Sequence, residues 1–135
     1  MYSVSDIFFQ ALEDPRSVKQ TSHKSEVILG KSVRIEKCGN NIELYNLNKG
    51  GDYYKPLNEI ELQCFMDNGW KAGQLHLVIM NCLFKLDLIE QKIKTEVNTR
   101  KNDKHIQSLK TRREGMLVKY TKNKRKLNQL KSNSK

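Results

Sequence analysis

The chain has 135 residues, the length of one ordinary domain, and carries a formal net charge of +10 at pH 7. Hydrophobic residues make up 37% of it, below the roughly 45–50% of typical soluble domains. It lacks an uninterrupted run of about 18 apolar residues, which argues against a membrane-spanning protein.

The cysteines and the first residues both favour a reduced, cytoplasmic location. Cys38, Cys64 and Cys82 are an odd number, and residues 1–6 lack the basic and long apolar regions of a secretory signal. The scarcity of proline beside abundant Asn and Lys is typical of an AT-rich genome. This composition favours a phage or mobile-element origin, and therefore a host cytoplasm.

The positive charge is concentrated in the C-terminal part of the chain. Residues 1–70 hold 8 basic and 10 acidic residues, residues 71–97 hold 4 and 3, and residues 98–135 hold 13 and 2. We therefore expect a near-neutral α+β module over 1–97 and a turn or polar break over 98–103. A basic amphipathic helical arm over 104–131 and a disordered tail over 132–135 would follow.

The first expected element is a short helix over Asp6–Glu13, with apolar residues at helical spacing and Ser3 or Ser5 as its cap. The polar residues 16–25 are expected to form a loop. Two Val- and Ile-rich segments, 26–29 and 32–37, predict strands, and a further strand contains Ile42 and Leu44. The turn at 38–41 makes a β-hairpin, which must pack on another element because isolated hairpins are only marginally stable.

A turn is expected at 48–52, followed by a helix over Leu57–Asp67 that ends at Gly69, with Trp70 packed on it. The segment 57–73, a helix followed by Gly69-Trp70-x-x-Gly73, resembles modules found near phage homing endonucleases. The resemblance implies contact with DNA, although Gln74 stands where a basic residue is usual in those modules. The alternative is a plain helix end with a core tryptophan.

Residues 74–97 predict a helix that is apolar on most sides and then continues as an apolar stripe, Leu86, Ile89, Ile93 and Val97. This helix is expected to be the hub of the module, or equally the interface of a homodimer. The polar residues 98–103 either turn the chain into a helical hairpin, with Asn102 or Asp103 as the next cap, or belong to one continuous helix.

A heptad frame fits residues 104–131. Positions a are Ile106, Arg113, Tyr120 and Leu127, and positions d are Leu109, Met116, Asn123 and Leu130. The flanking e and g positions are mostly Lys or Arg, which disfavours a parallel homodimer. The arm therefore requires a neutral or anionic neighbour, and the preceding helix offers only Asp87, Glu90 and Glu96.

Nucleic acid is the commonest anion that such an arm binds, through salt-sensitive and sequence-independent contacts with phosphates. No motif for specific base readout is present. We predict a small nucleic-acid-binding protein whose basic helix contacts phosphates. The alternative is a coiled-coil module that binds and modulates an acidic host or phage protein. The expected nucleic-acid-binding residues are Arg112, Arg113, Lys119, Lys122, Lys124, Arg125 and Lys126.

The sequence gives no indication of enzymatic chemistry. Cys64, His76 and Cys82 do not have the spacing of zinc ligands, and no Cys-x-x-Cys pair occurs. Glu59 and Glu61 are two residues apart on a predicted helix and so do not face each other. We therefore predict no catalytic residue, metal or cofactor.

Overall fold

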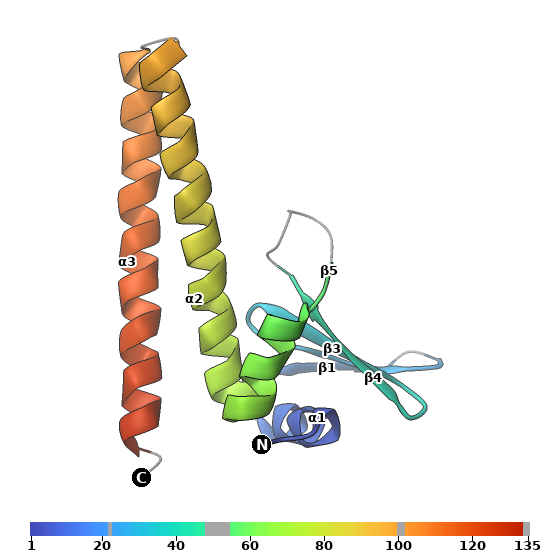
Figure 1. Ribbon diagram of the computed structural model, residues 1–135. Helices are drawn as coiled ribbons and strands as arrows, with labels where there is room; N and C mark the ends of the chain where they lie inside the picture. Colours follow the sequence, from blue (N-terminus) through green and yellow to red (C-terminus); the bar gives the residue numbers. More distant parts are fainter. Residues whose placement is uncertain (22, 48–54, 100–101, 134–135) are drawn as a thin grey trace. The chain divides into compact units, whose positions relative to one another are not determined.

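The structure, a computed structural model, describes residues 1–21, 23–47, 55–99 and 102–133 (Figure 1). The elements, in chain order, are α1 (Val4–Glu13), β1 (Val18–Thr21), β2 (Glu26–Leu29), β3 (Val33–Cys38), β4 (Asn41–Asn46), β5 (Lys55–Pro56), α2 (Glu59–Thr99) and α3 (Asp103–Asn133). The chain forms two compact units, Met1–Leu77 and Val78–Lys135. The predicted α+β class is confirmed, and the boundary between the units lies inside α2.

Helix α1 begins at a capping box, in which two residues at the helix start each accept the backbone N–H of the other with their side chains. The backbone N–H of Asp6 donates to Ser3 Oγ at 3.1 Å, and the backbone N–H of Ser3 donates to Asp6 Oδ2 at 2.8 Å. Ser3, rather than Ser5, is therefore the cap of the predicted helix. The helix buries Ile7, Phe8 and Ala11.

The five strands form one antiparallel sheet in the order β1-β2-β3-β4-β5. Strands β3 and β4 are the predicted hairpin, paired from Val33 with Asn46 to Cys38 with Asn41. Strand β1 lies in the segment that was expected to be a loop, and that expectation was wrong. All four of its residues are exposed, so the strand lacks the apolar alternation that reveals strands in a sequence. The turn predicted at 48–52 lies outside the described residues.

The core of the first unit joins the sheet to α1 and to the beginning of α2. Ile28, Val33, Ile35 and Leu44 come from the sheet. They pack in one buried cluster with Ile7, Phe8, Ala11, Phe65, Trp70 and Leu77. The predicted packing of a short helix and a β-hairpin on a buried helix is therefore confirmed.

Gly69 interrupts α2, where its φ of 86° and ψ of −177° are not helical. The predicted helix end is thus present, and the chain resumes a helix at Trp70. The backbone N–H of Trp70 donates to Gln10 Oε1 at 2.8 Å, which satisfies one group at the new helix start. The Trp70 ring lies 6.0 Å from that of Phe65, between ring centroids, as expected for a tryptophan packed on the preceding helix.

Gly73 allows the two helical segments on either side of Gly69 to approach closely. A Cβ atom at position 73 would collide with Phe65 Cδ1. The two glycines of the Gly-Trp-x-x-Gly segment therefore have a structural explanation, one for the bend and one for close packing.

By length and composition, α2 is able to cross a membrane. The core helix of a soluble protein meets the same criteria, so this property is weak evidence for a membrane location.

Candidate nucleic-acid interface

The second unit is a helical hairpin made of α3 and the part of α2 that follows residue 77. Ile89 and Ile93 of α2 form a buried cluster with Leu109 of α3. Asn102 caps α3, since the backbone N–H of His105 donates to its Oδ1 at 3.3 Å. Of the two predicted arrangements, the helical hairpin is therefore the one observed, and Asn102 is the cap.

The burial of α3 follows the predicted heptad frame. Each of the eight a and d positions from Ile106 to Leu130 is buried or half-buried, and every other residue from 104 to 131 is exposed. Helix α3 continues to Asn133, so the helix includes the first two residues of the expected tail. Residues 134 and 135 lie outside the described part of the chain.

Helix α2 shows the same periodicity in this unit. Its buried residues are Val78, Ile79, Cys82, Ile89, Ile93 and Glu96, with Leu86 half-buried. Val97, which is predicted to lie on the apolar stripe, is 45% exposed, and the neighbouring carboxylate Glu96 is only 7% exposed. The buried seam therefore ends on an acidic residue that hydrophobicity could not reveal.

One ion pair and one contact between a histidine and a carboxylate join the helices across the seam. Arg113 Nη1 donates to Glu90 Oε1 at 2.6 Å, and His105 Nε2 lies 3.6 Å from Glu96 Oε1. The preceding helix therefore supplies anionic neighbours to α3, although its few acidic residues made it an unpromising partner in the sequence. Arg113 is half-buried in this pair, so its charge is already compensated within the hairpin.

The other residues predicted to bind nucleic acid lie exposed along α3. Lys124 lies beside Tyr120, with its Nζ 3.1 Å from the Tyr120 hydroxyl and 5.5 Å from the ring centroid. The side chains of the remaining five have no hydrogen bond or ion pair with any residue that the structure describes: Arg112, Lys119, Lys122, Arg125 and Lys126.

Four of these five form a line along one side of α3, which we call the basic stripe: Arg112, Lys119, Lys122 and Lys126. Their spacing of seven, three and four residues keeps them on one side of a helix. The 14 steps along the helix from Arg112 to Lys126 extend over about 21 Å at 1.5 Å per residue. This length allows several phosphates of one backbone to be contacted at once.

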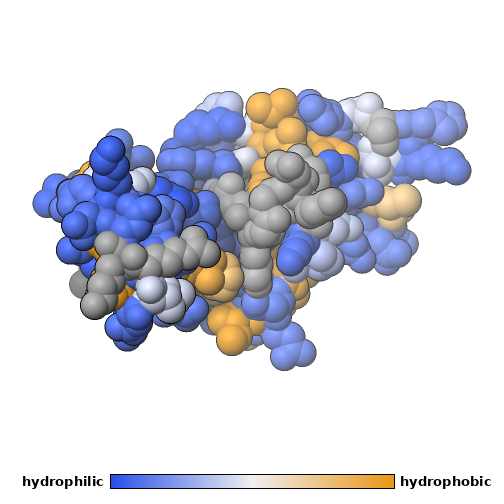
Figure 2. Space-filling model, turned by 90° about the horizontal axis from the view of Figure 1, so that it is seen from above, coloured by the Kyte–Doolittle hydropathy of each residue, from blue (hydrophilic) through white to orange (hydrophobic). Residues whose placement is uncertain are grey.

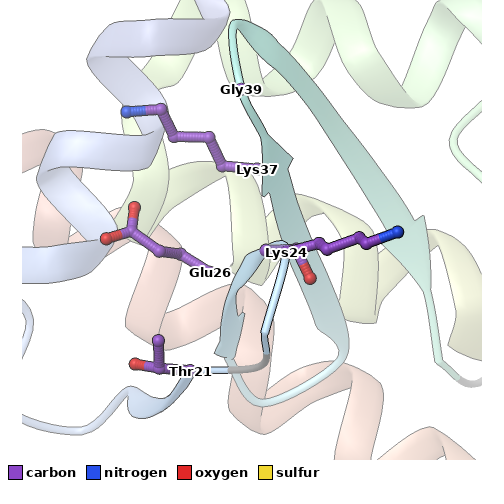
Figure 3. A pocket seen from close by; sticks show the side chains of 6 residues that line it. Thr21, Lys24, Glu26, Lys37 and Gly39 are labelled. Atoms are coloured by element: carbon purple, nitrogen blue, oxygen red, sulfur yellow. The ribbon is translucent and has the colours of Figure 1, made fainter.

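A shallow hollow in the first unit, near the end of the sheet, is lined by Thr21, Lys24, Ser25, Glu26, Lys37 and Gly39. Figure 3 shows Lys24 pointing away from Lys37 and Glu26. Lys37 Nζ lies instead 5.1 Å from the centroid of the Phe8 ring. The lining residues do not converge on one point, so this hollow has no arrangement for catalysis.

Metal-binding side chains do not gather within the described residues. In those parts of the chain, no three or more His, Cys, Asp or Glu side chains lie together in a group that could hold an ion. The three cysteines are free thiols, and Cys82 is buried in the hairpin unit.

Comparisons with protein-family models, with curated protein sequences and with solved structures found no match to this chain. The resemblance of residues 57–73 to modules near homing endonucleases therefore stays a prediction, as do the phage origin and the cytoplasmic location.

Proposed function

We propose that this protein binds nucleic acid through the basic stripe on α3 and contacts phosphates without reading the base sequence. The observation that carries the proposal is the exposure of the stripe. Its four cations lie on the outside of the seam and have no ionic partner among the described residues. An uncompensated row of cations attracts a polyanion, and the release of condensed counterions favours its binding.

The geometry of the hairpin supports this proposal in a second way. The apolar residues of α3 pack at its seam, so the basic side chains are held on a rigid helix. A preorganised surface loses less conformational entropy when a ligand binds. The ion pair with Glu90 removes Arg113 from the proposed contact residues, and we therefore exclude it from the site.

The proposal is tested by measuring the affinity of the full chain for generic duplex DNA over a range of salt concentrations. We expect the affinity to fall steeply with salt, with a slope of about −0.9 for each phosphate contact. Replacement of the stripe by Arg112→Gln, Lys119→Gln, Lys122→Gln and Lys126→Gln should reduce the slope by about 4. Absence of binding at low salt would contradict the proposal.

A second candidate function, association with another protein, is favoured by exposed apolar side chains on the hairpin. Leu83, Phe84, Leu117 and Val118 are 49%, 53%, 44% and 67% exposed. The face seen in Figure 2 is mostly hydrophilic but includes several hydrophobic areas. A second copy of the chain is the simplest partner, as predicted for the helix over 74–97. Light scattering tests this homodimer. A dimer in the wild type that becomes a monomer on Leu83→Gln with Leu117→Gln supports it, and a wild-type monomer at high concentration excludes it.

A further inference from the structure

Two contacts between the helices of the hairpin determine which side chains share a face. In the heptad frame of α2, Ile79, Leu86 and Ile93 are a positions, and Cys82, Ile89 and Glu96 are d positions. Glu96, at d, meets His105, at g, whereas Glu90, at e, meets Arg113, at a. Since d and g lie on one side of a helix seam and a and e on the other, the g residues of both helices share one face.

This shared face collects cations from both helices. Helix α2 contributes Lys85 and Lys92 at g positions, and α3 contributes the basic stripe. We call these six residues the basic face: Lys85, Lys92, Arg112, Lys119, Lys122 and Lys126. Lys85 is half-buried and Lys92 exposed, and neither has an ionic partner among the described residues.

The acidic residues of the hairpin are segregated from this face. Among residues 78–99 and 105–131, no g position and no adjacent c position is acidic. Glu90 lies at e on the opposite face, and Asp87 and Glu114 lie at b positions beside it. Glu96, at the seam, is paired with His105. The face therefore adds the cations of α2 to the uncompensated cations of α3.

We propose that the basic face binds the phosphate backbone of duplex nucleic acid, with Lys85 and Lys92 of α2 as contact residues. This inference rests on the proposed function and specifies its ligand. Packed helices lie about 8–10 Å apart and are each about 10 Å wide, so the face is roughly 20 Å across. The major groove is only about 12 Å wide, so this face lies across the backbones and does not enter the groove.

A duplex fits the face better than a single strand does. Proteins that bind single strands stack bases on exposed aromatic rings. The aromatic residues of the hairpin are Phe84, on the outer side of α2, and Tyr120, at a seam position of α3. Neither ring lies on the basic face, so the face offers cations and no stacking platform.

The decisive experiment compares two double variants of the full chain that lose the same charge. Lys85→Gln with Lys92→Gln removes the α2 cations of the basic face. Lys94→Gln with Lys110→Gln removes two exposed cations from the opposite side of the hairpin, at b and e positions. Binding to a duplex DNA of arbitrary sequence is titrated with salt. We expect the first variant to reduce the slope of log affinity against log salt by about 2, and the second to leave it unchanged.

The outcomes separate this inference from the proposed function. If the stripe variants weaken binding but Lys85→Gln with Lys92→Gln does not, the inference is wrong and the proposed function stands. Equal losses in both double variants would also overturn it, since they indicate a general effect of net charge. If the wild-type chain binds no nucleic acid, both are wrong. Lys92→Gln alone changes only an exposed residue, so a smaller slope in this variant cannot result from misfolding. Circular dichroism checks that its helix content is unchanged.

Competition identifies the ligand. Duplex DNA and duplex RNA share the phosphodiester backbone, and displacement by either one supports the inference and shows which duplex is preferred. Preferential displacement by a single strand of equal length would contradict it. Displacement by polyglutamate at equal charge concentration, as effective as that by a duplex, would instead indicate an acidic protein partner.

Discussion

The two units of this chain are stabilised in different ways. In the first, residues distant in sequence meet in one buried cluster, and polar side chains are hydrogen-bonded within it, as Trp70 Nε1 is to Asp14 Oδ2 at 3.0 Å. In the second, two helices meet along a regular seam, with the Arg113–Glu90 ion pair and the His105–Glu96 contact at its sides and cations outside. The first unit therefore depends on individual buried contacts, and the second on a repeated pattern that leaves its surface available for binding.

The substitution expected to have the largest effect is Trp70→Ala, in the first unit. Trp70 is 1% exposed, packs on Phe65 and holds the Asp14 carboxylate. Loss of its ring leaves a cavity and an unpaired buried acceptor, so we expect a loss of about 3–5 kcal/mol in the free energy of unfolding. Urea denaturation measures the free energy of unfolding, and hydrogen exchange shows which amides lose protection. Amides in 103–131 should keep their protection. Equal loss of protection in both units would show that they unfold as one.

The next largest effect is expected for Asp14→Asn, which keeps the shape and removes the charge. Burial raises the pKa of Asp14. Hydrogen bonds from the Arg16 backbone N–H and the Trp70 indole, together with the nearby Arg16 charge, lower the pKa by more than burial raises it, so that it lies below 3.8. The carboxylate therefore contributes stability above pH 3.8 that is lost as the pH falls through the folded-state pKa. We expect Asp14→Asn to cost about 1–3 kcal/mol at neutral pH.

The free energy of unfolding of Asp14→Asn should also depend less on pH in the acid range than that of the wild type. Tryptophan fluorescence follows it selectively, because Trp70 is the only tryptophan of the chain and lies in the first unit. If Asp14→Asn and the wild type show the same stability at pH 7 and the same acid midpoint, the carboxylate has no structural role.

Parts of this architecture follow from the sequence because they are periodic. The heptad frame identified every buried position of α3 from 106 to 130, since an apolar seam of two helices repeats along the chain. Strand β1 could not be predicted in the same way, because it is exposed and its position depends on pairing with β2. The same limitation explains why Arg113 was included among the predicted nucleic-acid-binding residues, since its ion pair with Glu90 depends on how the two helices align.

Lys85 and Lys92 show how a candidate site residue escapes sequence reasoning. They occur in a segment whose charge is nearly balanced, so composition does not distinguish them from a solvated helix surface. Only the alignment of α2 with α3, given by Glu96 with His105 and Glu90 with Arg113, places them on the same face as the stripe. A heptad frame extended over residues 79–96 is the sequence signal that would have located them.

Gly115→Ala tests the second unit in the opposite direction. A Cβ atom at Gly115 meets nothing within 4 Å, and alanine favours helix over glycine, so we expect a gain of about 0.5–1 kcal/mol. Thermal unfolding followed at 222 nm measures the effect. Gly73→Ala is the matched control in the first unit, where the added Cβ would collide with Phe65. The same substitution should thus stabilise one unit and destabilise the other by about 1–3 kcal/mol. Effects of one sign at both positions would contradict the contrast between them.

The smallest effect is expected for the ion pair between Glu90 and Arg113. Both side chains are partly exposed, at 46% and 31%, so solvent screens their attraction. A double-mutant cycle with Glu90→Gln and Arg113→Gln should give a coupling free energy of about 0.2–1 kcal/mol that declines as salt is added. Arg113→Gln should also leave the salt dependence of nucleic-acid binding unchanged, whereas Lys119→Gln should reduce it. If Arg113→Gln weakened binding as strongly as Lys119→Gln, the arginine would contact phosphate in spite of its ion pair, and the seam would contribute to the binding surface.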